Sequence, residues 1–117
     1  MNIIFGDSVS GMPDSYTVLP LDTFRVKDSN ELMVAWAVID KIPLGEFATA
    51  ADNKKIHEEM MGFYRERHWN YCEHAIDYLM GKWNGELDTF YSDLLKRVID
   101  YKQNPPDAEW NGTRVRA

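Results

Sequence analysis

The spacing of the hydrophobic residues changes at residues 42–45, where Ile-Pro-Leu-Gly divides the chain. Before this point the sequence is rich in β-branched and aromatic residues, which favour strands; the predicted strands cover residues 2–5, 16–26 and 31–40. After it, apolar residues recur every three or four positions, as on a helix with one buried face. Because the strands precede the helices, the sequence predicts an α+β fold, with an antiparallel β-meander of about three strands followed by three helices.

Two features refine the strand prediction. Residues 31–40 are apolar on both faces for several positions, so we expect this strand to be central and covered. Pro20 interrupts the strand at 16–26, which favours an edge position or a β-bulge, since proline cannot donate a ladder hydrogen bond.

The helices are delimited by capping and breaking residues. We expect them to begin at a Thr49 cap, near His68 and at an Asn84 cap, and the last to end at Asn104-Pro105-Pro106. The 117 residues suffice for one domain, with a β part at 1–43, a helical part at 44–104 and a tail at 105–117. We expect the prolines to turn the tail back, so that Trp110 docks onto the helices.

Composition excludes several classes of partner. The net charge of −6 is spread thinly and forms no basic stripe, so we expect no nucleic acid partner. There is no apolar run long enough to cross a membrane and no leader pattern, and the single cysteine, Cys72, excludes an internal disulfide. We therefore expect a cytoplasmic protein that does not contact a membrane.

The stretch Gly6-Asp7-Ser8 follows a predicted strand and resembles the start of the GDSL family of esterases and lipases, in which the serine is the nucleophile. A serine nucleophile needs a base, a group that orients the base, and oxyanion donors. The chain lacks the later Asp-x-x-His block that supplies the base in that family. We therefore predict a turn at Ser8 and no catalytic residues.

The three histidines offer an alternative that the sequence leaves open. His57 and Glu58 begin like a His-Glu-x-x-His zinc motif, but Met61 takes the place of the second histidine. His68 and Cys72 are one helical turn apart, with Glu73 and His74 nearby, yet His74 points away from Cys72 on a helix. A small metal-binding protein or enzyme using the His57, His68 and His74 region is thus an alternative, while the leading prediction has no metal and no cofactor.

Residues 63–79 resemble the centre of a tetratricopeptide (TPR) repeat, in which small and bulky residues alternate where two helices cross. The matching residues are Phe63, Trp69, Cys72, Ile76 and Leu79. Arg67 stands where that family usually has glycine. The resemblance implies a TPR-like hairpin of the first two helices.

Two looser resemblances extend further. Residues 64–112, with Tyr91, Arg97, Tyr101 and the Pro-Pro-x3-Trp-x-Gly sequence, are similar to the TPR-like tail of some class III nucleotide cyclases. The segments at 16–26 and 81–97 are similar to uncharacterised small proteins of T4-like marine cyanophages. The second resemblance implies a bacteriophage protein in the host cytoplasm.

The leading functional hypothesis is a non-enzymatic protein–protein interaction module, with a phage accessory role implied by the resemblance. The candidate contact residues lie off or at the border of the apolar stripes: Tyr64, Tyr71, His74 and Tyr78. A structural homo-oligomer is the other alternative, and it would form by strand pairing if the run at 32–39 lay at a sheet edge.

Overall fold

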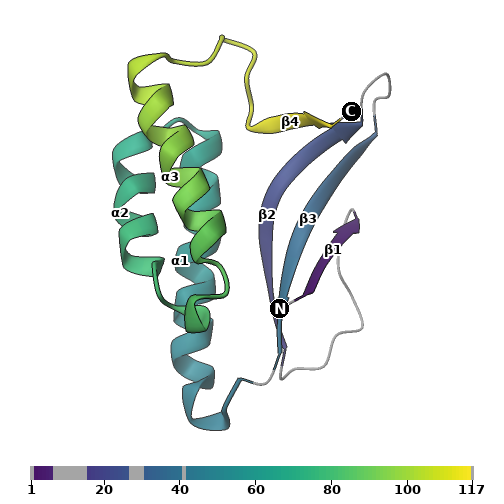
Figure 1. Cartoon of the computed structure of the whole chain (residues 1–117), viewed down its shortest axis with the longest axis vertical. Helices are drawn as coiled ribbons and strands as arrows, with labels where there is room; N and C mark the ends of the chain where they lie inside the picture. Colours follow the sequence, from purple (N-terminus) through teal and green to yellow (C-terminus); the bar gives the residue numbers. More distant parts are fainter. Residues whose placement is uncertain (1, 7–15, 27–30, 41, 117) are drawn as a thin grey trace. The chain divides into compact units, whose positions relative to one another are not determined.

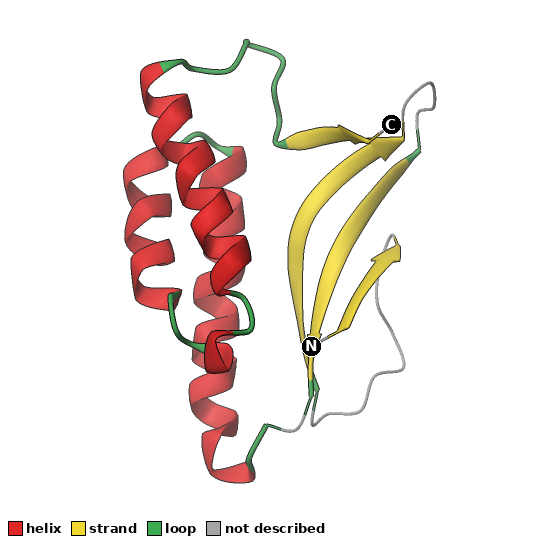
Figure 2. Cartoon of the chain, in the orientation of Figure 1, coloured by secondary structure: helices red, strands yellow, loops and turns green. Residues whose placement is uncertain are grey.

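The computed structural model describes residues 2–6, 16–26, 31–40 and 42–116 (Figure 1). The strands are β1 Asn2–Gly6, β2 Thr17–Val26, β3 Leu32–Ile39 and β4 Thr113–Arg116; the helices are α1 Phe47–Arg65, α2 Trp69–Leu79 and α3 Asp88–Gln103, with short 3-10 turns η1 Leu44–Glu46 and η2 Trp83–Gly85. Figure 2 shows these helices and strands by colour. The predicted α+β fold is confirmed. Among the described residues, no helix combines the length and the apolar character needed to cross a membrane.

The chain forms two compact units, and their boundary falls inside α1. One unit comprises residues 1–54 and 112–117 and holds the sheet; the other comprises residues 55–111 and holds α2, α3 and the rest of α1. Each unit is described by itself below.

The sheet has the strand order β1-β3-β2-β4. β3 pairs antiparallel with both β1 and β2, so its predicted central position is confirmed. The order differs from a simple meander, because β1 pairs with β3 and not with β2. The connection from Gly6 to Thr17 is longer than the two to five residues of an ordinary hairpin loop, which suits strands that are not neighbours. β4 was not predicted; it lies in the tail and pairs parallel with β2.

The predicted bulge at Pro20 is confirmed. Pro20 pairs with Trp36 and Thr23 with Val34, so β2 uses one residue more than β3 over this step. The buried Asp22 lies in the extra stretch, and its Oδ2 is 3.8 Å from an Nη1 of Arg114 in β4. The acidic side chain in the bulge therefore lies close to β4, the strand that pairs with β2.

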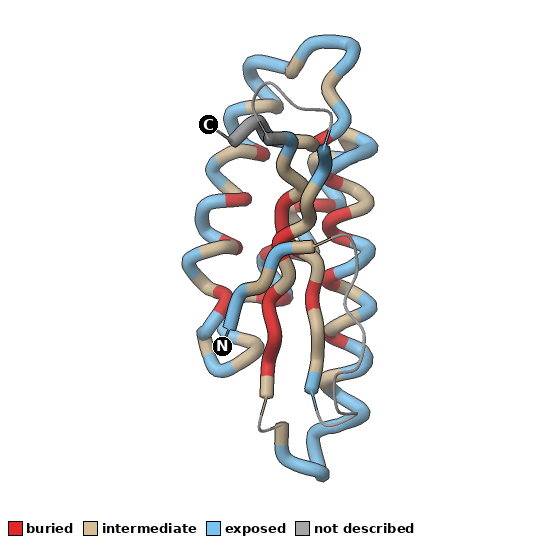
Figure 3. The backbone as a smooth tube through the Cα atoms, turned by 90° about the vertical axis from the view of Figure 1, so that its right-hand side faces the viewer, coloured by how far each residue is buried: buried red, intermediate tan, exposed pale blue. Residues whose placement is uncertain are grey.

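Three helical stripes form the core of the second unit. As predicted, the apolar positions of α2 and α3 face inward, and Met60, Met61 and Tyr64 of α1 are buried as well (Figure 3). The fully buried residues of α2 and α3 are Cys72, Ile76, Leu79, Tyr91, Leu94 and Val98. α3 packs against α2, and the Lys102 ammonium donates to Oε2 of Glu73 over 2.8 Å.

The predicted caps were wrong. α1 begins at Phe47, ahead of Thr49, and Asn84 does not cap α3. Asn84 instead lies in a left-handed turn, with φ of 49° at Trp83, 54° at Asn84 and 76° at Gly85. The Asp88 carboxylate accepts the Gly81 N–H over 2.8 Å and ties this turn to the first residue of α3. The first residue of α3 therefore stabilises the loop that leads into the helix, where the sequence predicted a cap at Asn84.

Candidate functional site

The turn between α1 and α2 is a Schellman motif with an arginine at its left-handed position. The His68 N–H donates to the carbonyl of Phe63 over 2.9 Å, and the Arg67 N–H donates to that of Tyr64 over 3.2 Å. Arg67 has φ 65°, the left-handed conformation that glycine adopts without cost. This is the position at which the TPR resemblance has glycine.

The Arg67 side chain offsets the cost of this backbone conformation. Its guanidinium donates to the carbonyls of Pro106 over 3.2 Å, of Trp110 over 3.1 Å, and of Asp107. It also lies 5.5 Å from the centroid of the Trp110 ring. One cation thus joins the α1–α2 turn to the segment that follows α3.

The docking of Trp110 onto the helices is confirmed. Its ring lies 5.2 Å from Tyr64, 5.7 Å from Trp69 and 5.2 Å from Tyr101, in tilted or edge-to-face arrangements. Tyr64 is only 1% exposed, and its hydroxyl accepts from Arg97 over 3.3 Å. Tyr64 is therefore a core residue, and the prediction that it lies on a contact surface was wrong.

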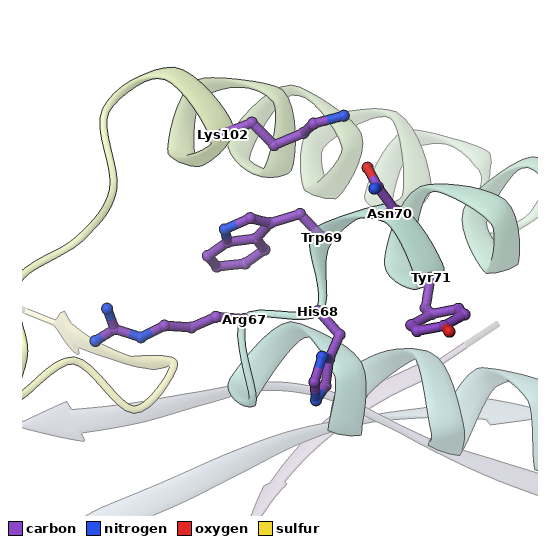
Figure 4. Close-up of a pocket in the computed structure, with 6 residues that line it drawn as sticks. All are labelled: Arg67, His68, Trp69, Asn70, Tyr71 and Lys102. Atoms are coloured by element: carbon purple, nitrogen blue, oxygen red, sulfur yellow. The ribbon is translucent and has the colours of Figure 1, made fainter.

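A surface pocket of about 410 Å³ opens beside this cluster, at the start of α2 (Figure 4). Its lining combines cationic, aromatic and amide groups from Arg67, His68, Trp69, Asn70, Tyr71 and Lys102. In Figure 4 the Trp69 indole projects between Arg67 and Lys102, whereas His68 and Tyr71 project from the other side of the turn. The volume falls in the range of small-molecule sites, and Trp69 belongs both to the aromatic cluster and to the lining of the pocket.

The three remaining predicted contact residues share one side of α2. Tyr71, His74 and Tyr78 are spaced i, i+3 and i+7, and all three are exposed; we call them the α2 ridge. Tyr71 is 65% exposed and Tyr78 47% exposed, while the opposite stripe of α2 is fully buried. The ridge begins at Tyr71 in the pocket and runs along the helix.

Neighbouring side chains hold the two tyrosines of the ridge in place. The ring of Tyr71 lies 5.4 Å from Phe63 and 6.2 Å from His68. The Lys82 ammonium lies 4.8 Å from the centroid of Tyr78. Sequence reasoning missed these flanking residues, although His68 and Tyr71 are three positions apart, the spacing that makes helical neighbours.

The histidines lie in three different environments. His57 is fully buried, with its Nδ1 2.9 Å from the Tyr91 hydroxyl. His68 Nε2 is 3.4 Å from Glu66, and His74 is exposed on the α2 ridge. In the described part of the chain, no three His, Cys, Asp or Glu side chains come close enough to share a metal ion.

The Cys72 thiol is buried in the second unit. Burial, with a smaller contribution from Glu73, raises the pKa of the Cys72 thiol to about 12, so the thiol is protonated at neutral pH. Its Sγ lies 3.8 Å from the Met60 carbonyl oxygen. Ser8 lies outside the described residues.

The exposed side of α2 combines aromatic and polar groups on an ordered helix. Comparisons of the chain with protein-family models, curated proteins and solved structures find no match. Exposed tyrosines on an ordered helix offer large apolar area at low entropy cost, together with a polar tip that can hydrogen-bond. The pocket and the α2 ridge therefore form the candidate site.

Proposed function

We propose that this protein is a non-enzymatic protein–protein interaction module and that the α2 ridge contacts the partner. The observation that carries the proposal is the exposure of Tyr71 and Tyr78 on a helix whose other side is fully buried. Tyrosine is enriched in protein interfaces and among the residues that dominate their binding energy.

The spacing of the ridge supports a particular mode of binding. Side chains at i, i+3 and i+7 are the anchors by which an amphipathic helix enters a groove on another protein. Tyr71, His74 and Tyr78 have this spacing. On the other side of α2, Cys72 and Ile76 are buried and fix the helix in the core. α2 would enter the groove already folded, so no helix-ordering entropy is lost on binding.

The resemblance to small cyanophage proteins supports a more specific role. In line with it, we propose a phage accessory factor in the host cytoplasm, whose partner is a host or phage protein. The TPR-like hairpin belongs to the same proposal, since TPR-like helices serve as interaction scaffolds.

The test compares three forms of the protein in affinity capture from host or infected-cell lysate. We expect wild type to retain a stoichiometric partner and the Tyr71→Ala/Tyr78→Ala variant to lose it. Tyr16→Ala, which removes an exposed tyrosine outside α2, is the matched control and should retain the partner. Hydrogen exchange on the purified complex should then show slower exchange across residues 69–79.

Two results would overturn the proposal. One is a partner that both the double variant and the control retain, since the ridge would then be dispensable. The other is a folded wild-type protein that retains nothing from either lysate.

A further inference from the structure

The two edge strands of the described sheet differ in how well their sequences protect them from pairing with a strand of another molecule. β1 and β4 are the edge strands. β4 reads Thr-Arg-Val-Arg, with two arginines in four residues, and charged residues are a common protection of sheet edges. β1 reads Asn-Ile-Ile-Phe-Gly and has no charge, no proline and no bulge in its pairing with β3.

The side chains of β1 add apolar surface to this edge. Ile3 is 49% exposed and Phe5 48% exposed, and they point to the same face because side chains alternate along a strand. Phe5 also contacts the Phe24 ring of β2, at 6.3 Å between centroids. Figure 3 shows β1 with exposed positions, whereas the buried positions of the sheet gather on β2 and β3.

From this contrast we infer that β1 pairs antiparallel with β1 of a second copy of this chain, about a two-fold axis through Ile4. In that register Ile3 faces Phe5 of the other copy, and Phe5 faces Ile3. Each cross-strand pair then joins a β-branched and an aromatic residue, a combination that stabilises antiparallel strands. Asn2 would face Gly6, where no side chain obstructs it. The two sheets would become one continuous sheet.

Charge and self-complementarity favour a second copy as the occupant. Each copy carries a net charge of −6, so two copies repel wherever their charged surfaces meet. β1 is free of charge, and pairing through it juxtaposes no like charges. A two-fold axis uses the same segment twice, and this segment matches itself without a second sequence.

The same pairing gives a different route to self-assembly from the one predicted from sequence. That alternative depended on residues 32–39 lying at a sheet edge, a condition that β3 does not meet because it is paired on both sides. A five-residue edge buries less than the roughly 1,600 Å² of a standard interface. The dimer is therefore expected to be weak and to depend on concentration.

The experiment measures molar mass by light scattering, from micromolar to millimolar protein, for wild type and two charged variants. We expect wild type to shift from monomer to dimer, and Ile3→Lys/Phe5→Lys to stay monomeric because each lysine would face a lysine. Ile3→Glu/Phe5→Lys should again dimerise, since each glutamate would face a lysine in the proposed register. Ile99→Lys, at an exposed position of α3, is the control and should behave as wild type.

Each other result overturns the inference. A wild-type protein that stays monomeric at millimolar concentration excludes the dimer, and a lysine variant that still dimerises places the contact elsewhere. If neither charged variant dimerises although circular dichroism shows both to be folded, the register about Ile4 is wrong. Tyr71→Ala/Tyr78→Ala should dimerise as wild type, so this test is independent of the proposed partner-binding function.

Discussion

The hydroxyl oxygen of Tyr91 lies 2.9 Å from Nδ1 of His57, although the two residues are 34 positions apart in the chain. The same oxygen accepts the Trp83 indole N–H over 3.0 Å. Since the indole nitrogen is only a donor, the Tyr91 hydroxyl is free to donate its own proton to an unprotonated Nδ1. One phenol therefore joins α1, α3 and the left-handed turn inside the second unit.

Removal of this hydroxyl should be costly. Tyr91→Phe takes a partner from a buried imidazole nitrogen and from an indole N–H, and we expect the free energy of unfolding to fall by about 1–3 kcal/mol. Denaturation by urea measures the change. Tyr71→Phe, which removes an exposed hydroxyl, is the control and should change stability by less than about 0.5 kcal/mol. Equal losses in the two variants would contradict the network.

Stability should fall at alkaline pH. Burial, then the Glu73 carboxylate, raises the pKa of Cys72 from 9.0 to about 12, with Arg97 opposing. Burial also raises the pKa of Tyr91 above 10.0; the Trp83 hydrogen bond lowers it in part and Asp88 adds to the rise. The stabilisation is complete below pH 9, where the thiol keeps its proton in the unfolded chain as well. It is lost as the pH rises further, because the groups ionise in the unfolded chain before they ionise in the folded protein.

We therefore expect the free energy of unfolding to decline from about pH 9, by at most about 1.4 kcal/mol per pH unit for each group. Urea denaturation in a series of buffers from neutral to alkaline pH measures the slope. Cys72→Ala should remove the contribution of the thiol, which begins near pH 9 and continues toward pH 12, and leave only the decline that begins near pH 10 with Tyr91. A slope that is the same in Cys72→Ala and wild type would argue against the buried thiol as its source.

Substitutions at Arg67 should distinguish the contribution of its side chain to stability from the cost of its backbone conformation. Arg67→Ala loses the hydrogen bonds to three carbonyls and keeps the left-handed conformation, so we expect a loss of about 2–4 kcal/mol. Arg67→Gly loses the same bonds but removes the conformational cost, and it should be more stable than Arg67→Ala by about 1 kcal/mol. Thermal unfolding followed by tryptophan fluorescence also reports on Trp110, and an alanine variant at least as stable as the glycine variant would refute this account.

Two glycines should respond oppositely to alanine. Gly62 lies inside α1, and a Cβ there meets no atom of the described residues within 4 Å, so Gly62→Ala should stabilise by about 0.5–1 kcal/mol. Gly81 has φ +82°, so Gly81→Ala should destabilise by about 1–2 kcal/mol. The midpoint of guanidinium denaturation distinguishes the two directions, and a shift of the same sign in both variants would contradict the assigned backbone conformations.

The parts of the fold that were predictable are those encoded by local periodicity. The three strands predicted at 2–5, 16–26 and 31–40, and the stripes that contain Cys72, Ile76 and Leu94, follow from the spacing of apolar residues, since burial requires these residues to share one face. β4 escaped prediction because its four residues contain two arginines, and its strand conformation depends on pairing with β2, far away in the sequence. The left-handed conformation of Trp83 escaped prediction because tryptophan, unlike Asn84 and Gly85, is not a residue that favours it.

For the candidate site, the exposure of a side chain was predictable where the residue lies clearly away from the apolar stripe of its helix. Tyr71, His74 and Tyr78 met that criterion and are exposed. Tyr64 sits at the border of its stripe, and its burial is decided by Trp69 and Trp110, which pack on it from elsewhere in the chain. The pocket depends on the pairing of the α1–α2 turn with Lys102 at the end of α3, a relationship that periodicity does not encode.

The parallel pairing of β4 with β2 also sets an order of events in folding. Thr23 pairs with Thr113, so about ninety residues must be spanned before the ladder can form, and each doubling of such a loop adds about 0.6 kcal/mol of closure entropy. During synthesis, β1, β2 and β3 leave the ribosome long before β4 exists. The edge of β2 that pairs with β4 therefore has no partner strand until the whole helical unit, residues 55–111, has been translated.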